Sequence, residues 1–198
     1  MASSPTPQRM SLVPALEILR DIREDRVVIT TMSAARHWPQ ISHHALDLNY
    51  VPSSMGQGTS LAQGIAMASP QQEVIVLNGD GSLLMNLGSL VTICANQVSN
   101  ITVIVIDNGI YEVTGGQQTA GAMANVDYAA MARAAGFVTV ATFEQLTAWQ
   151  GAATEVLSSP GPRFLLWRVH PRYEDFHLNV PGPIGPRLDR LREALTSS

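Results

Sequence analysis

Two uninterrupted runs of apolar, largely β-branched residues constrain the fold of this chain more than any other feature. "EVIVL" covers residues 73–77 and "ITVIVI" covers residues 101–106. Strands without polar alternation are typical of the centre of a parallel sheet, where helices cover both faces. The segment between the two runs is long enough for the crossover helix that joins parallel neighbours. The sequence therefore predicts a parallel α/β sheet around these two strands.

The remaining segments continue the alternation of strands and helices. Further strands are expected at residues 26–31, 137–141 and 163–169. Helices are expected, from apolar residues at helical spacing, at residues 11–25, 58–69, 83–98, 127–136, 143–159 and 187–195. This order predicts a doubly wound, mostly parallel sheet with helices on both faces. Because no linker or internal repeat divides the chain, residues 1–198 are expected to form a single domain, whose tail 170–198 holds a Pro-rich surface loop and the C-terminal helix.

Composition excludes several functional classes. A net charge of −4 provides no basic surface for nucleic acid. No apolar stretch approaches the ~20 residues of a membrane span, and the start "MASSPTPQRM" lacks the apolar core of a signal peptide. We therefore expect a cytoplasmic protein without a nucleic-acid or membrane partner. The single cysteine, Cys94, excludes an internal disulfide, and its apolar helical surroundings favour a buried structural thiol over a reactive one.

Glycines and oxygen-bearing side chains follow both central strands. Gly79-Asp80-Gly81-Ser82 comes after the first strand, and Asp107-Asn108-Gly109 after the second. Ligands of such sheets bind at the carboxyl ends of the strands, so Asp80 and Asn108 are expected to reach one point. The glycines allow a close approach of the backbone, and a helix starting near Ser82 would offer N–H groups to a phosphate. Either motif alone is also a common turn. Together they predict a Mg²⁺–diphosphate site, because Mg²⁺ prefers oxygen ligands and substrate phosphate.

The same motifs resemble the diphosphate-binding domain of thiamine-diphosphate enzymes. "YVPSSMGQGTSLAQGIAMA" is similar to the segment that precedes the Gly-Asp-Gly strand in that family. "DNGIYEVTGGQQT" and "GPRFLLWRV" most resemble the small subunit of sulfopyruvate decarboxylase and phosphonopyruvate decarboxylase. The resemblance extends over almost the whole chain.

This resemblance implies roles for individual residues. Asp80 and Asn108 would bind Mg²⁺ through their side chains, and Ile110 through its carbonyl. Met55 would support the bent cofactor, the Ser53 carbonyl would accept a hydrogen bond from the pyrimidine amino group, and Val113 and Thr114 would lie near the reactive thiazolium carbon. The complete set of implied cofactor-binding residues is Ser53, Ser54, Met55, Gly79, Asp80, Gly81, Ser82, Asn108, Ile110, Tyr111 and Val113. The chain departs from the family at Asp107, usually Asn, and at Ser53, usually Gly.

The resemblance also implies that half of the enzyme is missing. In this family a glutamate of a separate pyrimidine-binding domain activates the cofactor, and the chain is too short to contain that domain as well. Glu73 begins a strand at the wrong end, and Glu112 falls within the metal loop. The implied protein is one subunit of a split 2-oxo acid decarboxylase that releases CO₂ and an aldehyde. It would pair with a pyrimidine-domain subunit as α₂β₂ or a multiple. The alternatives are a carboligase of the acetolactate synthase type and a non-catalytic phosphate-binding module.

Two further features bear on substrate and partner. The segment "HWPQISHH" contains His37, His43 and His44, which could form a metal trio, face the substrate (His43 and His44), or belong to a solvated loop with a stacked Trp38. Their spacing matches no usual zinc pattern. Arg36 and Arg172, expected in loops, could pair with an anionic substrate. The small apolar face of residues 58–68 is expected to contact another chain.

Overall fold

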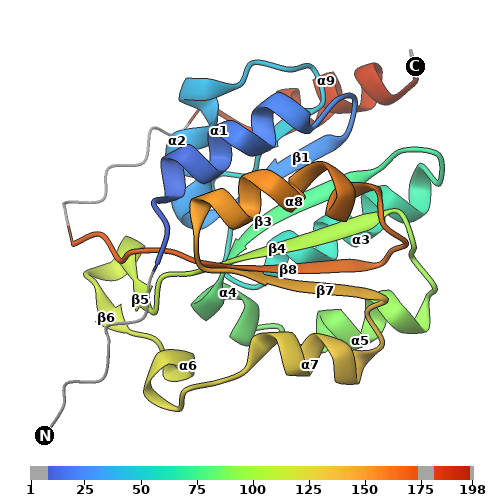
Figure 1. Cartoon of the computed structure of the whole chain (residues 1–198). Coiled ribbons are helices and arrows are strands. Elements are labelled where there is room, and N and C mark those ends of the chain that lie inside the picture. The colour runs from blue at the N-terminus through green and yellow to red at the C-terminus, as the bar shows by residue number, and fades with distance from the viewer. Residues whose placement is uncertain (1–8, 174–180, 197–198) are drawn as a thin grey trace, which may run out of the picture.

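A computed structural model describes residues 9–173 and 181–196, and in these residues a six-stranded parallel sheet forms the centre of the molecule (Figure 1). The strands, in spatial order, are β2 (Asp47–Asn49), β1 (Val27–Thr30), β3 (Val74–Gly79), β4 (Ile101–Asp107), β8 (Arg163–Arg168) and β7 (Thr139–Phe143). A small antiparallel pair, β5 (Ile110–Tyr111) and β6 (Gln117–Gln118), lies outside this sheet. The predicted doubly wound α/β architecture is confirmed.

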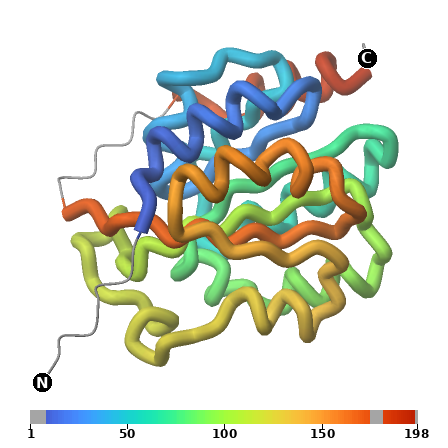
Figure 2. The backbone as a smooth tube through the Cα atoms, viewed as in Figure 1, coloured from blue at the N-terminus to red at the C-terminus, as the bar shows by residue number. Residues whose placement is uncertain are grey.

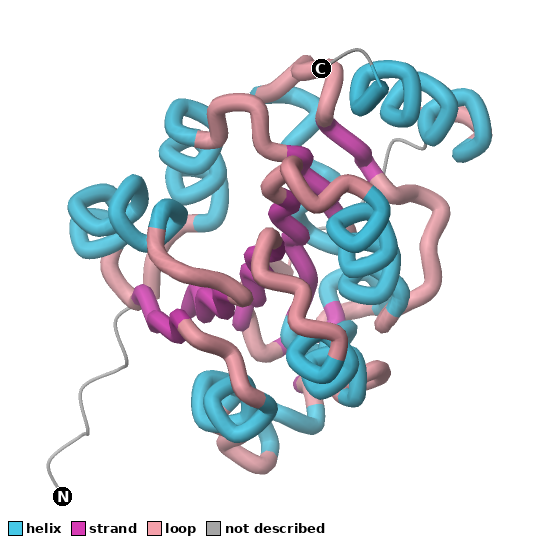
Figure 3. Tube along the Cα trace, turned by 90° about the vertical axis from the view of Figure 1, so that its right-hand side faces the viewer, coloured by secondary structure: helices cyan, strands magenta, loops and turns pink. Residues whose placement is uncertain are grey.

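Helices cover both faces of the sheet, as the end-on view in Figure 3 shows. One face carries α1 (Leu12–Ile22), α2 (Met32–Ile41) and α8 (Leu146–Ser158). The other carries α3 (Gln57–Ala68), α5 (Gly88–Ala95) and α7 (Tyr128–Ala135). Along β4, Val103 and Val105 belong to the core on the α3 side, whereas Ile104 and Ile106 belong to the core on the α1 side. Successive side chains of a strand point to opposite faces, so an uninterrupted apolar strand serves both cores.

Helices distant in sequence close the α1 face. In Figure 2 the blue α1 and the orange α8 run side by side. The Trp149 indole of α8 is fully buried and donates a hydrogen bond to the Ala15 carbonyl of α1, at 3.1 Å. Trp149 also packs against Trp167 of β8, with ring centroids 4.9 Å apart. This contact fixes the N-terminal helix to the second half of the chain.

The carboxyl ends of β1, β3 and β4 lie together at one end of the sheet. In the register of β3 and β4, Gly79 is opposite Ile106, so Asp80 and Asn108 follow at the same edge. From β1 the chain continues outward to β2, whereas from β3 it continues to β4 on the other side. The β1–β3 boundary is therefore a topological switch point, the place where ligands bind in open α/β sheets.

Three segments differ from the sequence-based expectation. Residues 32–41 form a helix, α2, rather than a loop, and residues 47–49 add the edge strand β2. The crossover helix expected at residues 83–98 is divided into α4 (Asp80–Leu84) and α5. At this break the Asn86 side chain donates to the Gly56 carbonyl and to Ser60 Oγ, both at 3.0 Å. These bonds tie the break to the start of α3.

The missed helix α2 contains a proline whose effect is compensated by a neighbouring strand. Pro39 has no N–H, so it cannot bond the carbonyl of Ala35 four residues earlier. The Asn49 side chain of β2 donates to that carbonyl instead, at 3.2 Å. Ala34 and Trp38, which are almost fully buried, provide the apolar face of the helix. Burial of this face therefore stabilises a helix that contains a proline.

One face of α3 packs against the chain's own sheet, while the expectation that residues 58–68 contact another chain stays a prediction. Gly58, Thr59, Ala62 and Ala66 are buried. A Cβ on Gly58 would approach the Thr31 Cγ2 methyl to 2.7 Å, which shows how closely α3 lies against β1 and β3. Met67 of the same helix is exposed, as are Met85 and Val91 in the segment that follows β3.

The C-terminal region ends in α9 (Ile184–Thr196), which includes the predicted helix 187–195 and lies beside β2. Its buried Arg187 donates hydrogen bonds to the carbonyls of Asn49, Val51 and Gly182. Part of the expected Pro-rich surface loop, residues 174–180, lies outside the described residues. Cys94 is half-buried, and desolvation raises the pKa of its thiol, in line with a structural role.

Candidate active site

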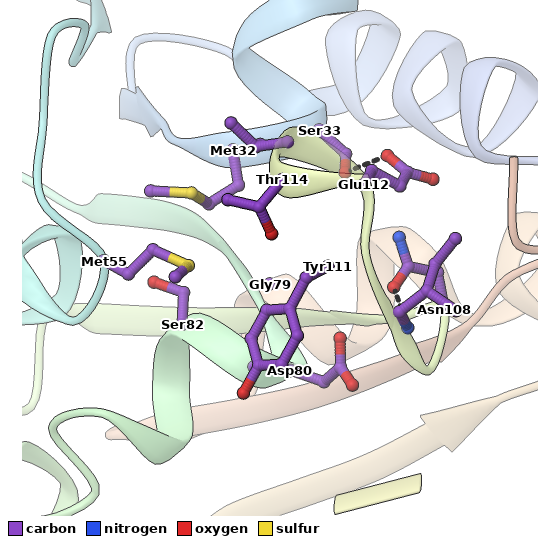
Figure 4. Close-up of a pocket in the computed structure, with 13 residues that line it drawn as sticks. Met32, Ser33, Met55, Gly79, Asp80, Ser82, Asn108, Tyr111, Glu112 and Thr114 are labelled. Carbon is purple, nitrogen blue, oxygen red and sulfur yellow. Dashed lines mark hydrogen bonds between the residues drawn. The ribbon is translucent and has the colours of Figure 1, made fainter. Parts of the chain in front are cut away.

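A pocket lies between the carboxyl ends of β1, β3 and β4, and most of the sequence-predicted residues line it (Figure 4). The predicted residues in its wall are Met55, Gly79, Asp80, Gly81, Ser82, Asn108, Ile110, Tyr111, Val113 and Thr114. They come from three stretches of chain: the turn before α3, the β3–α4 junction, and the segment that follows β4. The topology thus brings together motifs that are far apart in the sequence.

Asp80 is the buried acid of this pocket. It is the first residue of α4 and is 1% exposed. Its Oδ2 accepts a hydrogen bond from Thr119 Oγ1 at 2.8 Å. Burial raises the pKa of Asp80 to about 6, although the Thr119 bond and backbone N–H groups act in the opposite direction. A carboxylate held in so dry a place favours a cation beside it, because the cation would offset the cost of desolvation.

Asn108 and Ile110 form a tight bend opposite Asp80. The Asn108 side chain is buried, and its Oδ1 accepts a hydrogen bond from the Ile110 N–H at 3.0 Å. Gly109 between them has a φ of +76°, a conformation that favours glycine. The bend places an amide oxygen and a backbone carbonyl near a buried carboxylate. This is a donor set that suits Mg²⁺.

Asp107, the residue that departs from the family pattern, is held by two arginines. Arg168 Nε lies 3.8 Å from its Oδ2, and Arg9 donates to its backbone carbonyl at 2.9 Å. Burial raises the pKa of Asp107, whereas the charges of Arg9 and Arg168 lower it. The acid at this position is thus paired within the chain.

Gly81 and Ser82 bring the backbone close to the pocket. A Cβ on Gly81 would approach Tyr111 Cε1 to 2.3 Å, so the Tyr111 ring occupies the space that any side chain there would need. Ser82 is buried, and its Oγ accepts a hydrogen bond from the Gly56 N–H at 2.9 Å. The two glycine-containing motifs are therefore joined directly.

Ser53 and Ser54 lie just outside the pocket wall, in the turn before α3. The Ser54 N–H donates to Gln57 Oε1 at 3.2 Å. Ser53 is half-buried, and Met55, two residues on, is the first residue of this turn to line the pocket.

The structure does not bring His43 and His44 to this pocket. Both follow α2 and precede β2, and therefore lie at the amino end of the sheet, opposite Asp80. His44 Nε2 lies 3.6 Å from Asp25 Oδ1, and its Nδ1 accepts a hydrogen bond from the Leu46 N–H. His37 lies within α2. Among the described residues no cluster of three or more His, Cys, Asp or Glu side chains is arranged to hold a metal, so the metal-trio alternative is not supported.

Arg36 and Arg172, both expected in loops, have different settings. Arg36 belongs to α2, which corrects the expectation for this residue. Arg172 follows β8, and its backbone N–H donates to Glu112 Oε1 at 3.3 Å. Neither side chain lines the pocket.

Sequence reasoning missed four residues in or beside the pocket. Met32 and Ser33 line it from the start of α2, and Glu112 lines it from the short 3₁₀ helix Glu112–Thr114. Glu112 Oε2 accepts a hydrogen bond from Ser33 Oγ, which links these two walls. The fourth, Thr119, bonds Asp80 from behind. The position of Met32 directly after β1 could have suggested its role, whereas no spacing rule indicates Thr119.

Comparison with known proteins identifies the class of this α/β domain. Residues 27–166 match the family model described as "Thiamine pyrophosphate enzyme, C-terminal TPP binding domain". The chain therefore belongs to this family.

In the part of the chain that the structure describes, every helix is too short or too polar to cross a membrane.

Particular relatives refine the comparison. The chain is 32% identical over 163 residues to the sulfopyruvate decarboxylase subunit beta of Methanothermobacter thermautotrophicus, covering 82% of this chain and 84% of that one. It is 31% identical over 164 residues to the phosphonopyruvate decarboxylase of Streptomyces viridochromogenes, again over 82% of this chain but only 41% of that protein. Benzoylformate decarboxylase from Polynucleobacter necessarius shares the fold, with a TM-score of 0.67 at 18% identity over 88% of this chain and 36% of that one.

Proposed function

We propose that this chain is the diphosphate- and Mg²⁺-binding subunit of a split, thiamine-diphosphate-dependent 2-oxo acid decarboxylase that releases CO₂ and an aldehyde. The observation that carries the proposal is the buried Asp80 opposite the Asn108–Ile110 bend, at the switch point of the sheet. A non-catalytic relic of the fold would gain nothing from keeping a costly buried acid there.

The residues of the pocket fit the proposed cofactor. Asp80, Asn108 and the Ile110 carbonyl would hold Mg²⁺, and Gly81 and Ser82 would hold the diphosphate. Met55, Tyr111 and Val113 would pack against the organic part of the cofactor. When bound, thiamine diphosphate supplies the electron sink that decarboxylation of a 2-oxo acid requires.

The chain's own residues would bind and orient the cofactor and the substrate. They would not carry out the proton transfer that activates the cofactor. Val113 and Thr114 are exposed at the edge of the pocket, where a substrate and a second subunit could approach. Glu112 is held by Ser33 and by the Arg172 N–H, and therefore does not serve as a free base. The activating glutamate is accordingly assigned to a pyrimidine-domain partner in the cytoplasm.

The lengths of the relatives support this division of labour. The chain spans 84% of a protein named as a beta subunit, but only 41% of the phosphonopyruvate decarboxylase it matches. The longer relative contains a region without a counterpart in this chain, and that region could be the pyrimidine-binding domain. We propose an α₂β₂ assembly, or a multiple of it.

Substitution of Asp80 tests the cofactor site. Asp80→Ala should abolish Mg²⁺-dependent binding of thiamine diphosphate, measured by titration calorimetry with and without the partner subunit, and should leave the circular dichroism spectrum unchanged. Asp21→Ala removes an exposed acid of α1 and is the matched control, which should bind as the wild type does. Unchanged cofactor affinity in Asp80→Ala would contradict the proposed site.

The reaction is tested with both subunits and a panel of 2-oxo acids. We expect CO₂ and an aldehyde in equal amounts. Formation of a branched acetohydroxy acid without free aldehyde would instead establish the carboligase alternative. Binding of phosphate compounds without any turnover would establish the non-catalytic module.

A further inference from the structure

Thr119 lies behind the acid of the pocket and is completely buried. Its side-chain hydroxyl contacts Asp80 Oδ2 at 2.8 Å. Its backbone N–H donates to the Gly109 carbonyl at 2.9 Å, so the same residue is also fixed to the bend that contains Asn108. Thr119 thus connects the two sides of the proposed metal site while remaining outside the pocket wall.

The direction of the Thr119 proton follows from its partners. Thr119 Oγ1 accepts a hydrogen bond from the Ala122 N–H at 3.2 Å, as the N-cap of the short helix α6 (Ala120–Met123). A hydroxyl has one proton to donate, and an ionised carboxylate can only accept. The proton therefore points to Asp80 Oδ2. This bond restrains the rotation of the Asp80 carboxylate, which lines the pocket.

The packing around this bond leaves Thr119 little freedom. Its Cγ2 methyl lies 3.0 Å from where a Cβ on Gly81 would be, on the same side as the Tyr111 ring. The Tyr128 ring is also buried here, and its hydroxyl passes so close to Gly121 that a Cβ there would approach it to 1.8 Å. Asp80 is consequently supported by a rigid wall rather than by solvent.

From this geometry we infer that Thr119 is a positioning residue for the divalent cation, an inference that rests on the proposed function. Thr119 is not among the residues that line the pocket, and it acts by orienting Asp80. Loss of such an outer partner typically lowers metal affinity by roughly 10- to 100-fold. The alternative role is purely structural, namely capping of α6.

A Mg²⁺ titration separates these two roles. The full chain, with and without its partner subunit, is titrated with Mg²⁺ at fixed thiamine diphosphate, and cofactor binding is followed by calorimetry. Thr119→Val keeps the shape but removes the hydroxyl, and should raise the half-saturating Mg²⁺ concentration by about 10-fold or more. Thr119→Ser keeps the hydroxyl and should stay close to the wild type. At saturating Mg²⁺, Thr119→Val should bind the full amount of cofactor.

Met123→Gly is the control for the structural role. It weakens α6 at a residue that is 67% exposed, without touching Asp80, and should leave the Mg²⁺ requirement unchanged. Thr119→Ala is measured in parallel, so that at least one variant without the hydroxyl is available if the buried valine prevents folding. The same rise in Mg²⁺ requirement is expected for it.

The outcomes distinguish this inference from the proposed function. If the wild type shows no Mg²⁺-dependent cofactor binding in either form, the proposed function is wrong. If the wild type binds but Thr119→Val or Thr119→Ala has the wild-type Mg²⁺ requirement, only the role of Thr119 is overturned. An equal rise in Met123→Gly would assign the effect to α6 and would also overturn it.

Discussion

The Tyr111 ring lies where a side chain on residue 81 would have to be. Figure 4 shows this ring in the pocket together with Asp80, the residue before Gly81. The glycine at position 81 is thus required by a contact between two parts of the chain, and not only by an approaching phosphate. Gly79, two residues earlier, differs: its φ is −83°, and the nearest atom to a Cβ there would be Met32 Cβ at 3.8 Å. The two glycines of one motif therefore have different reasons to be glycine.

This difference predicts a larger loss of stability for one alanine substitution than for the other. Gly81→Ala should lower the free energy of unfolding by about 1–3 kcal/mol, because the methyl group overpacks a buried site. Gly79→Ala, in a conformation that alanine adopts readily, should stay within about 1 kcal/mol of the wild type. Urea unfolding of both variants measures the difference, and equal losses would refute the assigned contact between residues 81 and 111.

At the scale of elements, α2 shows how one segment can depend on its neighbour in space. The helix contains Pro39, and the carbonyl that the proline leaves free is bonded by Asn49 of β2. Asn49 Oδ1 also accepts the Thr30 hydroxyl of β1 at 2.9 Å. One side chain thus ties together a helix and two strands at the edge of the sheet.

A double-mutant cycle tests this dependence. Asn49→Ala should destabilise the protein by about 1–3 kcal/mol, because the buried Ala35 carbonyl loses its partner. In a Pro39→Ala background the new N–H can bond that carbonyl within the helix, so the cost of Asn49→Ala should fall by about 1 kcal/mol. Denaturant unfolding of all four proteins gives the coupling. Strict additivity would mean that Asn49 does not compensate for Pro39.

Features that depend on local sequence patterns were predicted correctly, whereas features that depend on contacts between distant residues were missed. The central strands and most helices were predictable because their apolar patterns are local, and the Asp80–Asn108 pairing followed from strand direction alone. The helix α2 was missed because Pro39 and His37 interrupt a short apolar stripe that is stabilised by burial of Trp38. The contacts of Ser33 with Glu112 and of Thr119 with Asp80 join residues 79 and 39 positions apart, which no local pattern encodes.

At the scale of the whole molecule, this chain lines one side of the pocket. Met55, Gly79–Ser82, Asn108 and Ile110–Thr114 line the pocket proposed for the metal and the diphosphate, and Val113 and Thr114 remain exposed at its rim. Exposed apolar side chains at Met67, Met85 and Val91 lie on or between α3 and α5. Both features are in keeping with a molecule that works only when another chain is present.

The proposed assembly predicts a strict requirement for two subunits. The purified chain with thiamine diphosphate and Mg²⁺ should release no CO₂ from any 2-oxo acid, because the activating glutamate would belong to the partner subunit. Addition of a pyrimidine-domain subunit should start turnover and shift the mass measured by light scattering to a hetero-oligomer. Turnover by the chain as a monomer would contradict the split-enzyme proposal.

Arg187 has a consequence for the solution behaviour of the molecule. It binds the carbonyl of Asn49, the last residue of the edge strand β2, and that of Val51 just beyond it. A parallel sheet could otherwise recruit a further strand from another copy at this edge. The C-terminal helix therefore protects the sheet against edge-to-edge aggregation by filling its acceptors with a charged side chain. A single guanidinium thus closes two carbonyls at this edge to a strand of a second copy.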